Sequence, residues 1–327
     1  MVQISKSRNA IDDQKNQCYH ETNRGDKMSY LNASAWKETF LRASRSHDGM
    51  ALHQLRAQIF QQDLEIIKNQ QYVSETGKTV LLPRDEGMIT HSKFYSKEIA
   101  PLSNSPCQET TISVSEQDCL VVARNLQEKN PCVLNMANRH NPGGGVLGGS
   151  GAQEEHLFRS SNYCLSLYQY APYAAAYGLK QATDQYPMDR NYGGIYSPEV
   201  TVFRGPENEG YPLLDEPWKT SFVAVPAINN PETTYQNGEA MLTEPMVEAT
   251  KRKIRTILRI ALTNGHTTLV LSAFGCGAFR NPPHHMALIF QEVLTEPEFL
   301  HAFDTIVFAV INDHNSNGNY EAFKSVF

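Results

Sequence analysis

The strongest constraint on this chain is a glycine-rich stretch near its middle. Six glycines fall within the nine residues Gly143–Gly151, inside the segment Asn135–Glu155, which reads NMANRHNPGGGVLGGSGAQEE. An apolar run, Cys132–Leu134, precedes this segment, and a helix-like run, His156–Tyr170, follows it. A glycine loop between a buried strand and a helix start allows sharp bends and close approach to a ligand. It also offers unpaired N–H groups that suit a phosphate.

The glycine stretch ends in Gln153-Glu154-Glu155. Two carboxylates beside an anion cradle indicate chemistry rather than phosphate binding alone. Because adjacent residues on a helix point in different directions, we expect Glu154 and Glu155 to have different tasks. A helix N-terminus favours the ionised carboxylate and lowers its pKa. A general acid at this position therefore needs burial or a nearby diphosphate to raise its pKa again.

Two common nucleotide-binding motifs do not explain the glycines. The run Gly143–Gly148 satisfies GxGxxG, but the strand ends about seven residues earlier and no acidic residue follows about 20 positions on. This context excludes a nicotinamide dehydrogenase. The chain also lacks the lysine of a P-loop, which excludes a P-loop nucleotidase.

A second glycine loop, Gly275–Gly277, follows the strand-like run Thr267–Ala273 and precedes a helix. Ligands of open α/β sheets collect at the carboxyl ends of strands, so two facing loops could hold a diphosphate. Cys276 in this loop has no identifiable histidine partner, so we interpret it as a small buried residue rather than a nucleophile.

The histidines give only a weak metal signal. His284, His285, His301 and His314 are the candidates, but adjacent histidines rarely converge on one ion and HExxH is absent. We expect no metal and no redox cofactor.

The bulk properties limit the partners. A net charge of −6 provides no strongly basic footprint for nucleic acid. No apolar run reaches the roughly 18 residues of a membrane helix, and the polar N-terminus has no signal core. Six cysteines without a CxxC pair are typical of reduced, buried thiols. We expect a monomeric, cytoplasmic protein, which would also enter the nucleus if the source is a eukaryote.

The chain divides into three parts by pattern. Residues 1–28 are polar and predict a disordered or loosely held tail. Residues 29–105 predict a mostly helical accessory region packed on the core, with a hairpin-like end. Strands and helices alternate through residues 106–327, which predicts an α/β sandwich around a central sheet.

The period-2 and period-3.6 patterns place the individual elements. The predicted strands are Thr79–Leu82, Thr111–Val114, Pro131–Met136, Val200–Arg204, Phe222–Ala227, Thr267–Ala273 and Thr305–Ile311. The predicted helices are Leu52–Gln70, Cys119–Lys129, His156–Tyr170, Thr243–Asn264, His284–Leu294 and Tyr320–Phe327. The charged run Lys251–Arg255 is interpreted as a solvated helix face.

Three glycines, Gly143–Gly145, then seven residues and Gln153-Glu154-Glu155 resemble the signature of the poly(ADP-ribose) glycohydrolases, a catalytic branch of the macrodomain fold. The sequence is similar to shorter, microbial-type members over roughly residues 35–327. This resemblance implies a three-layer α/β/α sandwich with a mixed central sheet and an N-terminal, mostly helical extension. The matching segments beyond the signature are Arg56–Val80, Tyr196–Arg204, Val225–Asn229 and Ser272–Pro282.

The resemblance implies hydrolysis of the O-glycosidic ribose–ribose bond of poly(ADP-ribose), releasing ADP-ribose. Glu155 would be the catalytic acid that later activates water, with an oxocarbenium-like transition state. Glu154 would hold ribose or leaving-group hydroxyls, Asn138 would orient the terminal ribose, and Phe279 would pack against it. The implied substrate-binding residues are Asn138, Gly143, Gly144, Gly145, Val146, Gln153, Gly275, Cys276, Gly277, Ala278 and Phe279.

One departure is Asn135, where the larger animal members carry an aspartate. Two alternatives stay open beside cleavage of the polymer. The protein could remove single ADP-ribose groups from a modified protein side chain, or it could bind ADP-ribose without cleaving it. The second alternative does not need two acids at the anomeric centre. The partner is accordingly ADP-ribose polymer or an ADP-ribosylated protein.

Overall fold

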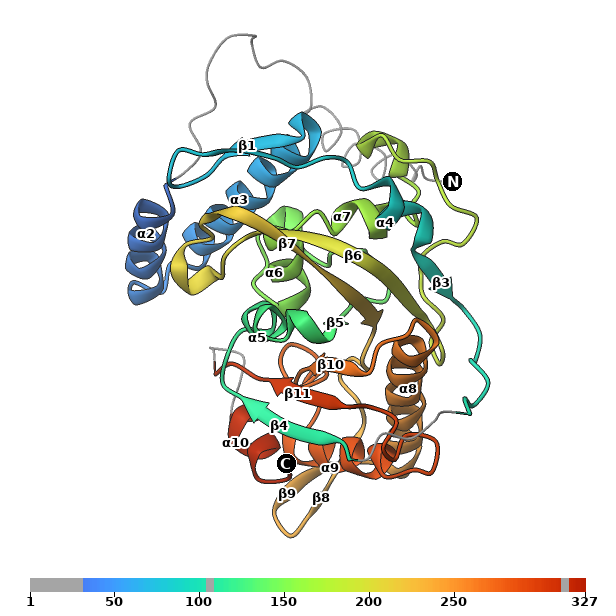
Figure 1. The fold of residues 1–327 in the computed structure, drawn as a ribbon. Helices are drawn as coiled ribbons and strands as arrows, with labels where there is room; N and C mark the ends of the chain where they lie inside the picture. Colours follow the sequence, from blue (N-terminus) through green and yellow to red (C-terminus); the bar gives the residue numbers. More distant parts are fainter. Residues whose placement is uncertain (1–31, 104–108, 313–317) are drawn as a thin grey trace, which may run out of the picture. The chain divides into compact units, whose positions relative to one another are not determined.

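A seven-stranded mixed sheet organises the fold (Figure 1). The computed structural model describes residues 32–103, 109–312 and 318–327, all within the unit Asn32–Phe327. The predicted tail, residues 1–28, lies outside the described residues. The sheet order is β3–β6–β7–β5–β10–β11–β4, with parallel pairing from β7 to β4 and antiparallel pairing at β6 and β3. The strands are Lys93–Tyr95 (β3), Thr111–Ser115 (β4), Cys132–Met136 (β5), Gly194–Arg204 (β6), Leu213–Val225 (β7), Thr268–Leu271 (β10) and Thr305–Ala309 (β11).

Alternating side chains of the sheet face two different apolar clusters. In β5, Leu134 joins one cluster and Val133 the other, and Val223 and Phe222 divide in the same way in β7. The first face is covered by Glu244–Thr263 (α8), Pro283–Leu294 (α9) and Asn319–Lys324 (α10). The second is covered by Glu86–His91 (α4), Cys119–Asn125 (α5), Gln153–Ser160 (α6) and Cys164–Tyr168 (α7). The predicted three-layer α/β/α sandwich with a mixed sheet is confirmed.

The N-terminal stretch adds helices and also completes the sheet. Trp36 donates its indole N–H to the carbonyl of Leu55 at 3.1 Å, which joins the first two described helices. Strand β3, within residues 29–105, pairs with β6 of the main sheet. The other elements here are Ala33–Arg45 (α2), Gly49–Asn69 (α3) and the hairpin of Gln71–Val73 (β1) and Thr79–Leu81 (β2).

Several short elements have no counterpart among those predicted from the sequence. They are the hairpin of Thr233–Gln236 (β8) and Glu239–Leu242 (β9), together with the 3₁₀ turns Val146–Gly148 (η3), Ala174–Tyr177 (η4) and Glu207–Glu209 (η5). A further turn, Gln127–Lys129 (η2), takes the place of the last part of the predicted helix Cys119–Lys129.

The predicted single helix His156–Tyr170 is wrong, because the structure has two helices, α6 and α7, with a break between them. Helix α6 starts earlier, at Gln153, and Ser161 is fully extended and bridges to Val202. The side chain of Asn162 accepts the N–H of Thr201 at 2.9 Å. The break therefore depends on pairing with β6, which a local pattern does not contain.

A buried ion pair connects α3 with β6. The Nε of Arg204 lies 2.6 Å from Asp63 Oδ1, and both side chains are almost wholly buried, at 1% and 0% exposed. Arg204 also donates to the carbonyl of Tyr211 at 2.8 Å. The accessory helix α3 is thus fixed to the sheet by charge as well as by apolar contact.

We expect Asp63→Asn to lower the free energy of unfolding by about 3–5 kcal/mol, because it leaves the Arg204 charge buried without its partner. The matched control is Glu292→Gln, whose carboxylate is 60% exposed and pairs with Lys251. The control should lower the free energy of unfolding by at most about 1 kcal/mol. Urea unfolding of both variants measures the difference, and equal losses would contradict a stabilising role of the buried pair.

Candidate active site

The two glutamates lie in the first turn of α6 and are buried, at 3% exposed for Glu154 and 7% for Glu155. Both oxygens of Glu154 accept backbone N–H groups of the glycine segment, from Asn138 at 2.7 Å and from Gly143 at 3.1 Å. The amide of Asn135 also donates to Glu154, at 3.4 Å. Glu154 therefore holds both ends of the turn that leads into the glycines.

Glu155 holds the middle of the same loop with one oxygen only. Its Oε1 accepts the N–H of Gly145 at 2.8 Å. Its Oε2 is buried and has no hydrogen-bond partner among the described residues. A β-carbon at Gly144, whose φ is +56°, would meet Glu155 Oε1. Only glycine therefore allows the backbone to pack this closely against the acid.

The electrostatics of the pair differ from those of an exposed helix N-terminus. Burial, and next the charge of Glu155, raise the pKa of Glu154 to about 8, while the N–H donors oppose this shift. Burial outweighs the helix N-terminus, whose effect on a carboxylate is the opposite. Near neutral pH Glu154 therefore retains its proton.

Gln153, predicted to bind substrate, also ties the helix start to the sheet. Its Oε1 accepts the N–H of Met136 at 2.9 Å, and its Nε2 donates to the carbonyl of Leu134 at 2.6 Å. These bonds fix the first turn of α6 at the end of β5. The side-chain oxygen of Asn138 accepts the N–H groups of His140 and Asn141, which shapes the turn after this strand.

Helix α3 supports the glycine loop from outside. The Nδ1 of His53 lies 3.0 Å from the carbonyl oxygen of Gly148. Gly149 has a φ of +77°, and a β-carbon there would meet the backbone carbonyl of His53. The contact therefore requires glycine at position 149, and the helix and the loop cannot approach closely with any other residue.

Arginine side chains continue this support. Arg159, fully buried, donates to the carbonyl of Ser150 at 2.7 Å and to the hydroxyl of Tyr211 at 2.9 Å. Tyr211 in turn donates to Glu207, which accepts two bonds from Arg56 of α3, at 2.7 and 2.8 Å. The sequence analysis did not identify this network, since its members are far apart in the chain and carry no motif.

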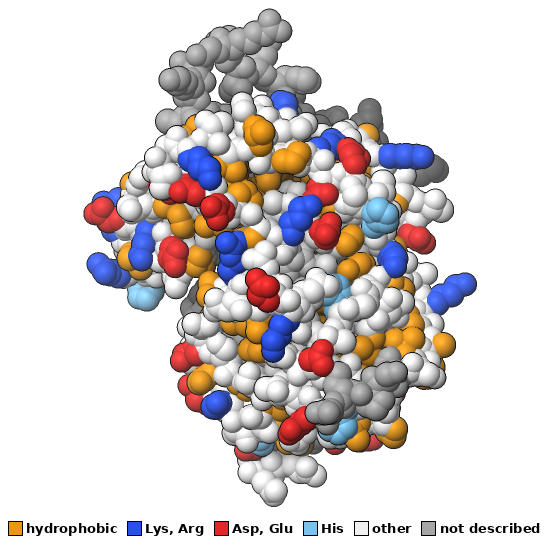
Figure 2. Space-filling view, in the orientation of Figure 1, with side chains coloured by type: hydrophobic (Ala, Val, Ile, Leu, Met, Phe, Trp, Pro, Cys, Tyr) orange, Lys and Arg blue, Asp and Glu red, His pale blue; other side chains and the backbone are white. Residues whose placement is uncertain are grey.

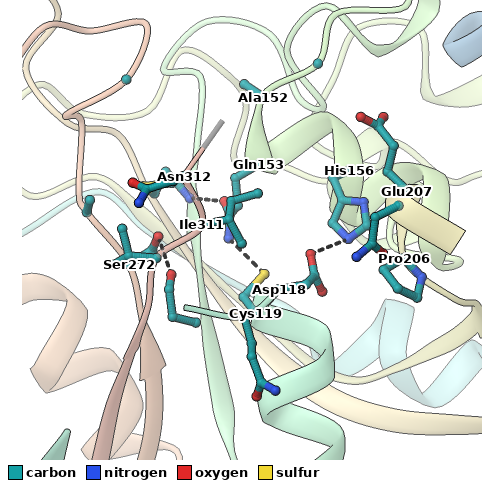
Figure 3. A pocket seen from close by; sticks show the side chains of 18 of the residues that line it. Asp118, Cys119, Ala152, Gln153, His156, Pro206, Glu207, Ser272, Ile311 and Asn312 are labelled. Carbon is teal, nitrogen blue, oxygen red and sulfur yellow. Dashed lines mark hydrogen bonds and ion pairs between the residues drawn. The ribbon is translucent and has the colours of Figure 1, made fainter. Parts of the chain in front are cut away.

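A cavity of about 800 Å³ opens at the carboxyl ends of the parallel strands. Its lining includes Gly275, Gly277, Ala278 and Phe279 of the second glycine loop and, opposite them, Gln153. In Figure 3, His156 faces Asp118 across 3.0 Å, with Ser272 and Asn312 on the other side of the cavity.

The acids and the first glycine loop, apart from Gly151 at its end, adjoin the cavity without lining it. Gln153, with Ala152 just before α6, forms the wall between them. The predicted residues outside the lining are Asn138, Gly143, Gly144, Gly145, Val146, Glu154, Glu155 and Cys276. The structure thus brings the second loop and Gln153 to one cavity, and it places the carboxyl pair directly beside it.

Cys276 and the candidate histidines of the described ranges lie outside the lining of the cavity. Cys276 is buried, and burial raises the pKa of its thiol far above the ordinary value, so the thiol stays protonated. The four described cysteines are free and buried, as predicted, whereas Cys18 and Cys107 lie outside the described residues. His285 accepts the N–H of Leu242 at 2.8 Å.

Figure 2 shows acidic and basic side chains interspersed over the face it presents. None of the helices in the described ranges is both long and apolar enough to cross a membrane. His314 lies outside these ranges, and within them no three His, Cys, Asp or Glu side chains converge as a metal site.

Comparison with known proteins identifies the family. Residues 60–205 match the microbial-type poly(ADP-ribose) glycohydrolase (PARG) catalytic domain. The enzyme structure from Thermomonospora curvata is 28% identical, with a TM-score of 0.69, and the match covers 83% of this chain and 99% of that one. A variant of the Deinococcus radiodurans enzyme, solved with ADP-ribose, is 30% identical, with a TM-score of 0.60 and coverage of 76% and 98%.

The chain belongs to the microbial-type PARG family. The predicted family and macrodomain-like fold are both confirmed, and the protein is a glycosidase of this family. The Thermomonospora curvata PARG has also been solved with the inhibitor ADP-HPD, in a structure with a TM-score of 0.66 to this chain. No curated protein sequence matches the chain.

Two neighbouring glycines test the contact between α3 and the loop. We expect Gly149→Ala to lower the free energy of unfolding by about 1–3 kcal/mol, because its β-carbon overlaps backbone that cannot move aside. Gly148→Ala is the control, since a β-carbon there meets nothing within 4 Å. Thermal unfolding and turnover of both variants give the comparison. An unfolding temperature and a turnover rate of Gly149→Ala equal to those of the unchanged protein would show that the contact is dispensable.

Proposed function

We propose that this protein hydrolyses the O-glycosidic ribose–ribose bond of poly(ADP-ribose) and releases ADP-ribose, with Glu155 as general acid and base. The observation that carries the assignment is the buried, unpartnered Oε2 of Glu155 within the described structure. An acid that is fixed by one oxygen and free at the other suits directed proton transfer. Its neighbour Glu154 has both oxygens engaged by backbone N–H groups, which suits a fixed positioning group.

The cavity is assigned to the ADP-ribose unit whose bond is cleaved. The Deinococcus radiodurans relative binds ADP-ribose, which supports the same ligand class here. The backbone of Gly275–Ala278 would hold the diphosphate, since its N–H groups follow the end of β10. With the terminal ribose at Asn138 and Phe279, the adenosine half would extend along the cavity toward Asp118.

The reaction follows from the roles of the carboxyls. Glu155 donates its proton to the bridging oxygen as the bond from that oxygen to the anomeric carbon breaks. Positive charge develops on the ribose, in an oxocarbenium-like transition state, as in glycoside hydrolysis generally. The Glu155 carboxylate then takes a proton from water while the water oxygen bonds to the anomeric carbon. Glu154 and Asn138 hold the ribose hydroxyls in place throughout.

We expect Glu155→Gln to lower the rate of ADP-ribose release from polymer by about 10²–10⁴-fold, because the amide cannot donate and retake the proton. The control Glu232→Gln changes an exposed carboxylate in the same way and should leave the rate unchanged. Release of ADP-ribose from automodified polymerase provides the measurement. Full activity of Glu155→Gln would disprove the mechanism.

The substrate class has its own test. Equal amounts of polymer, arginine-linked and serine-linked mono-ADP-ribosylated protein are offered to the wild-type enzyme. Release from polymer alone supports the proposal, whereas release from one of the mono-linked proteins alone would replace it with side-chain hydrolysis. Tight binding of ADP-ribose without release from any of the three would instead indicate a non-catalytic binding protein.

The raised pKa of Glu154 predicts a pH dependence. Above about pH 8 Glu154 loses its proton, so the form of the site with a neutral Glu154 declines and the rate should fall about tenfold per pH unit. Glu154→Gln removes the titrating carboxyl and should abolish this fall in rate above pH 8. The pH profile of kcat/KM for both proteins is the measurement, with circular dichroism to confirm folding. A profile that stays flat to pH 10 would contradict a role for the protonated form of Glu154.

A further inference from the structure

A group of basic residues lies beside the proposed ribose site, outside the cavity. It consists of Arg139, His140, Arg190 and Lys253 of α8, and we call it the basic rim. The sequence analysis interpreted Lys251–Arg255 as a solvated face, which is wrong for Lys253, since this residue is only 5% exposed. Its ammonium donates to the carbonyl of Arg190 at 2.8 Å.

Backbone contacts make the basic rim a fixed arrangement. Met188 donates its N–H to the carbonyl of Arg139, and Arg139 Nε donates back to the carbonyl of Met188, both at 2.9 Å. The segment leading to Arg190 is thereby joined to the residue directly after Asn138. Nη1 of Arg139 lies 3.1 Å from the ring of His140. Both His140 and Arg190 are exposed, so the rim is open to a ligand.

Positive charge accumulates around Lys253. Burial, and next the Arg139 charge, lower its pKa to about 8, with Arg190 and Arg252 contributing in the same direction. Asp189 is the carboxylate that opposes this effect, and it accepts the N–H groups of Asn191 and Tyr192, both at 2.8 Å. A bound anion would relieve the repulsion among these cations.

The strand order shows where a longer substrate would go. The proposed binding groups follow β4 at Asp118, β10 at the second glycine loop, and β5 at Asn138, in the order of the sheet. A terminal ADP-ribose unit laid along this row has its anomeric carbon at the β5 end. The next strands are β7 and β6, and the segment of Met188 and Arg190 leads into the start of β6 at the same sheet edge.

We propose that the basic rim binds the diphosphate of the ADP-ribose unit on the far side of the scissile bond. This inference rests on the proposed function and adds a second subsite to it. A single ADP-ribose group on a protein has no second diphosphate, so the rim favours polymer over mono-linked substrates. Cations that contact phosphates displace the counterions bound to them, so the part of the polymer affinity that the basic rim contributes should fall as the salt concentration rises.

Binding to a catalytically blocked enzyme tests the rim apart from turnover. In the Glu155→Gln background, we expect polymer to bind at least fivefold more tightly than free ADP-ribose, with the excess declining between about 50 and 200 mM salt. Adding Arg190→Glu should weaken polymer binding about five- to tenfold and reduce the salt slope by about one. The affinity for free ADP-ribose should change less than twofold.

Arg45→Glu is the matched control, because it makes the same charge change at an exposed position of α2. His140→Glu is a second rim variant in case Arg190→Glu does not fold, which circular dichroism would show. The proposal is overturned if rim and control variants bind polymer equally, if polymer binds no better than ADP-ribose, or if an RNA homopolymer binds as tightly. Absence of ADP-ribose release by the wild-type enzyme would disprove the proposed function instead. The binding comparison would still show whether the basic rim binds polymer.

Discussion

Three backbone N–H groups of the glycine segment donate hydrogen bonds to the two carboxyl side chains of α6, and the rest of the site depends on these hydrogen bonds. Asn138 and Gly143 donate to Glu154, and Gly145 donates to Glu155. The acids thus fix the loop, and the loop fixes the acids. Because Gly144 packs directly on Glu155, the arrangement has no room for a side chain there. Such mutual fixing leaves one acid oxygen in a defined place for chemistry.

The outer layers of the molecule maintain this arrangement from both sides. On the inner side, Gln153 anchors the first turn of α6 to β5. On the outer side, α3 contacts the loop at Gly148 and Gly149, and Arg159 bonds to Ser150. The buried charges of this region require many hydrogen bonds to offset their lost hydration. The N-terminal helices therefore have a physical reason to be part of a catalytic unit.

The sequence predicted those features whose cause is local. Apolar runs located most strands of the sheet, and the spacing of Gly143–Gly145 to Glu155 indicated the family. The helix break at Ser161 was missed because its cause is pairing with Thr201 and Val202 of another element. The supports of the loop were missed for a similar reason, since His53 and Gly148 are 95 residues apart and Arg56 and Glu207 are 151 apart. The burial of Lys253 likewise depends on Arg190, far from it in the chain.

Asn135 places a neutral amide beside the two carboxyl groups of α6. Its amide donates to Glu154 and to the hydroxyl of Tyr163, at 3.4 and 3.2 Å. An aspartate at this buried position would place a third carboxylate against Glu154 and would remove a donor. Because burial and Glu155 already raise the pKa of Glu154, a further negative charge would raise it more and hold the proton more tightly. The amide therefore lets Glu154 release its proton closer to neutral pH than an aspartate at position 135 would.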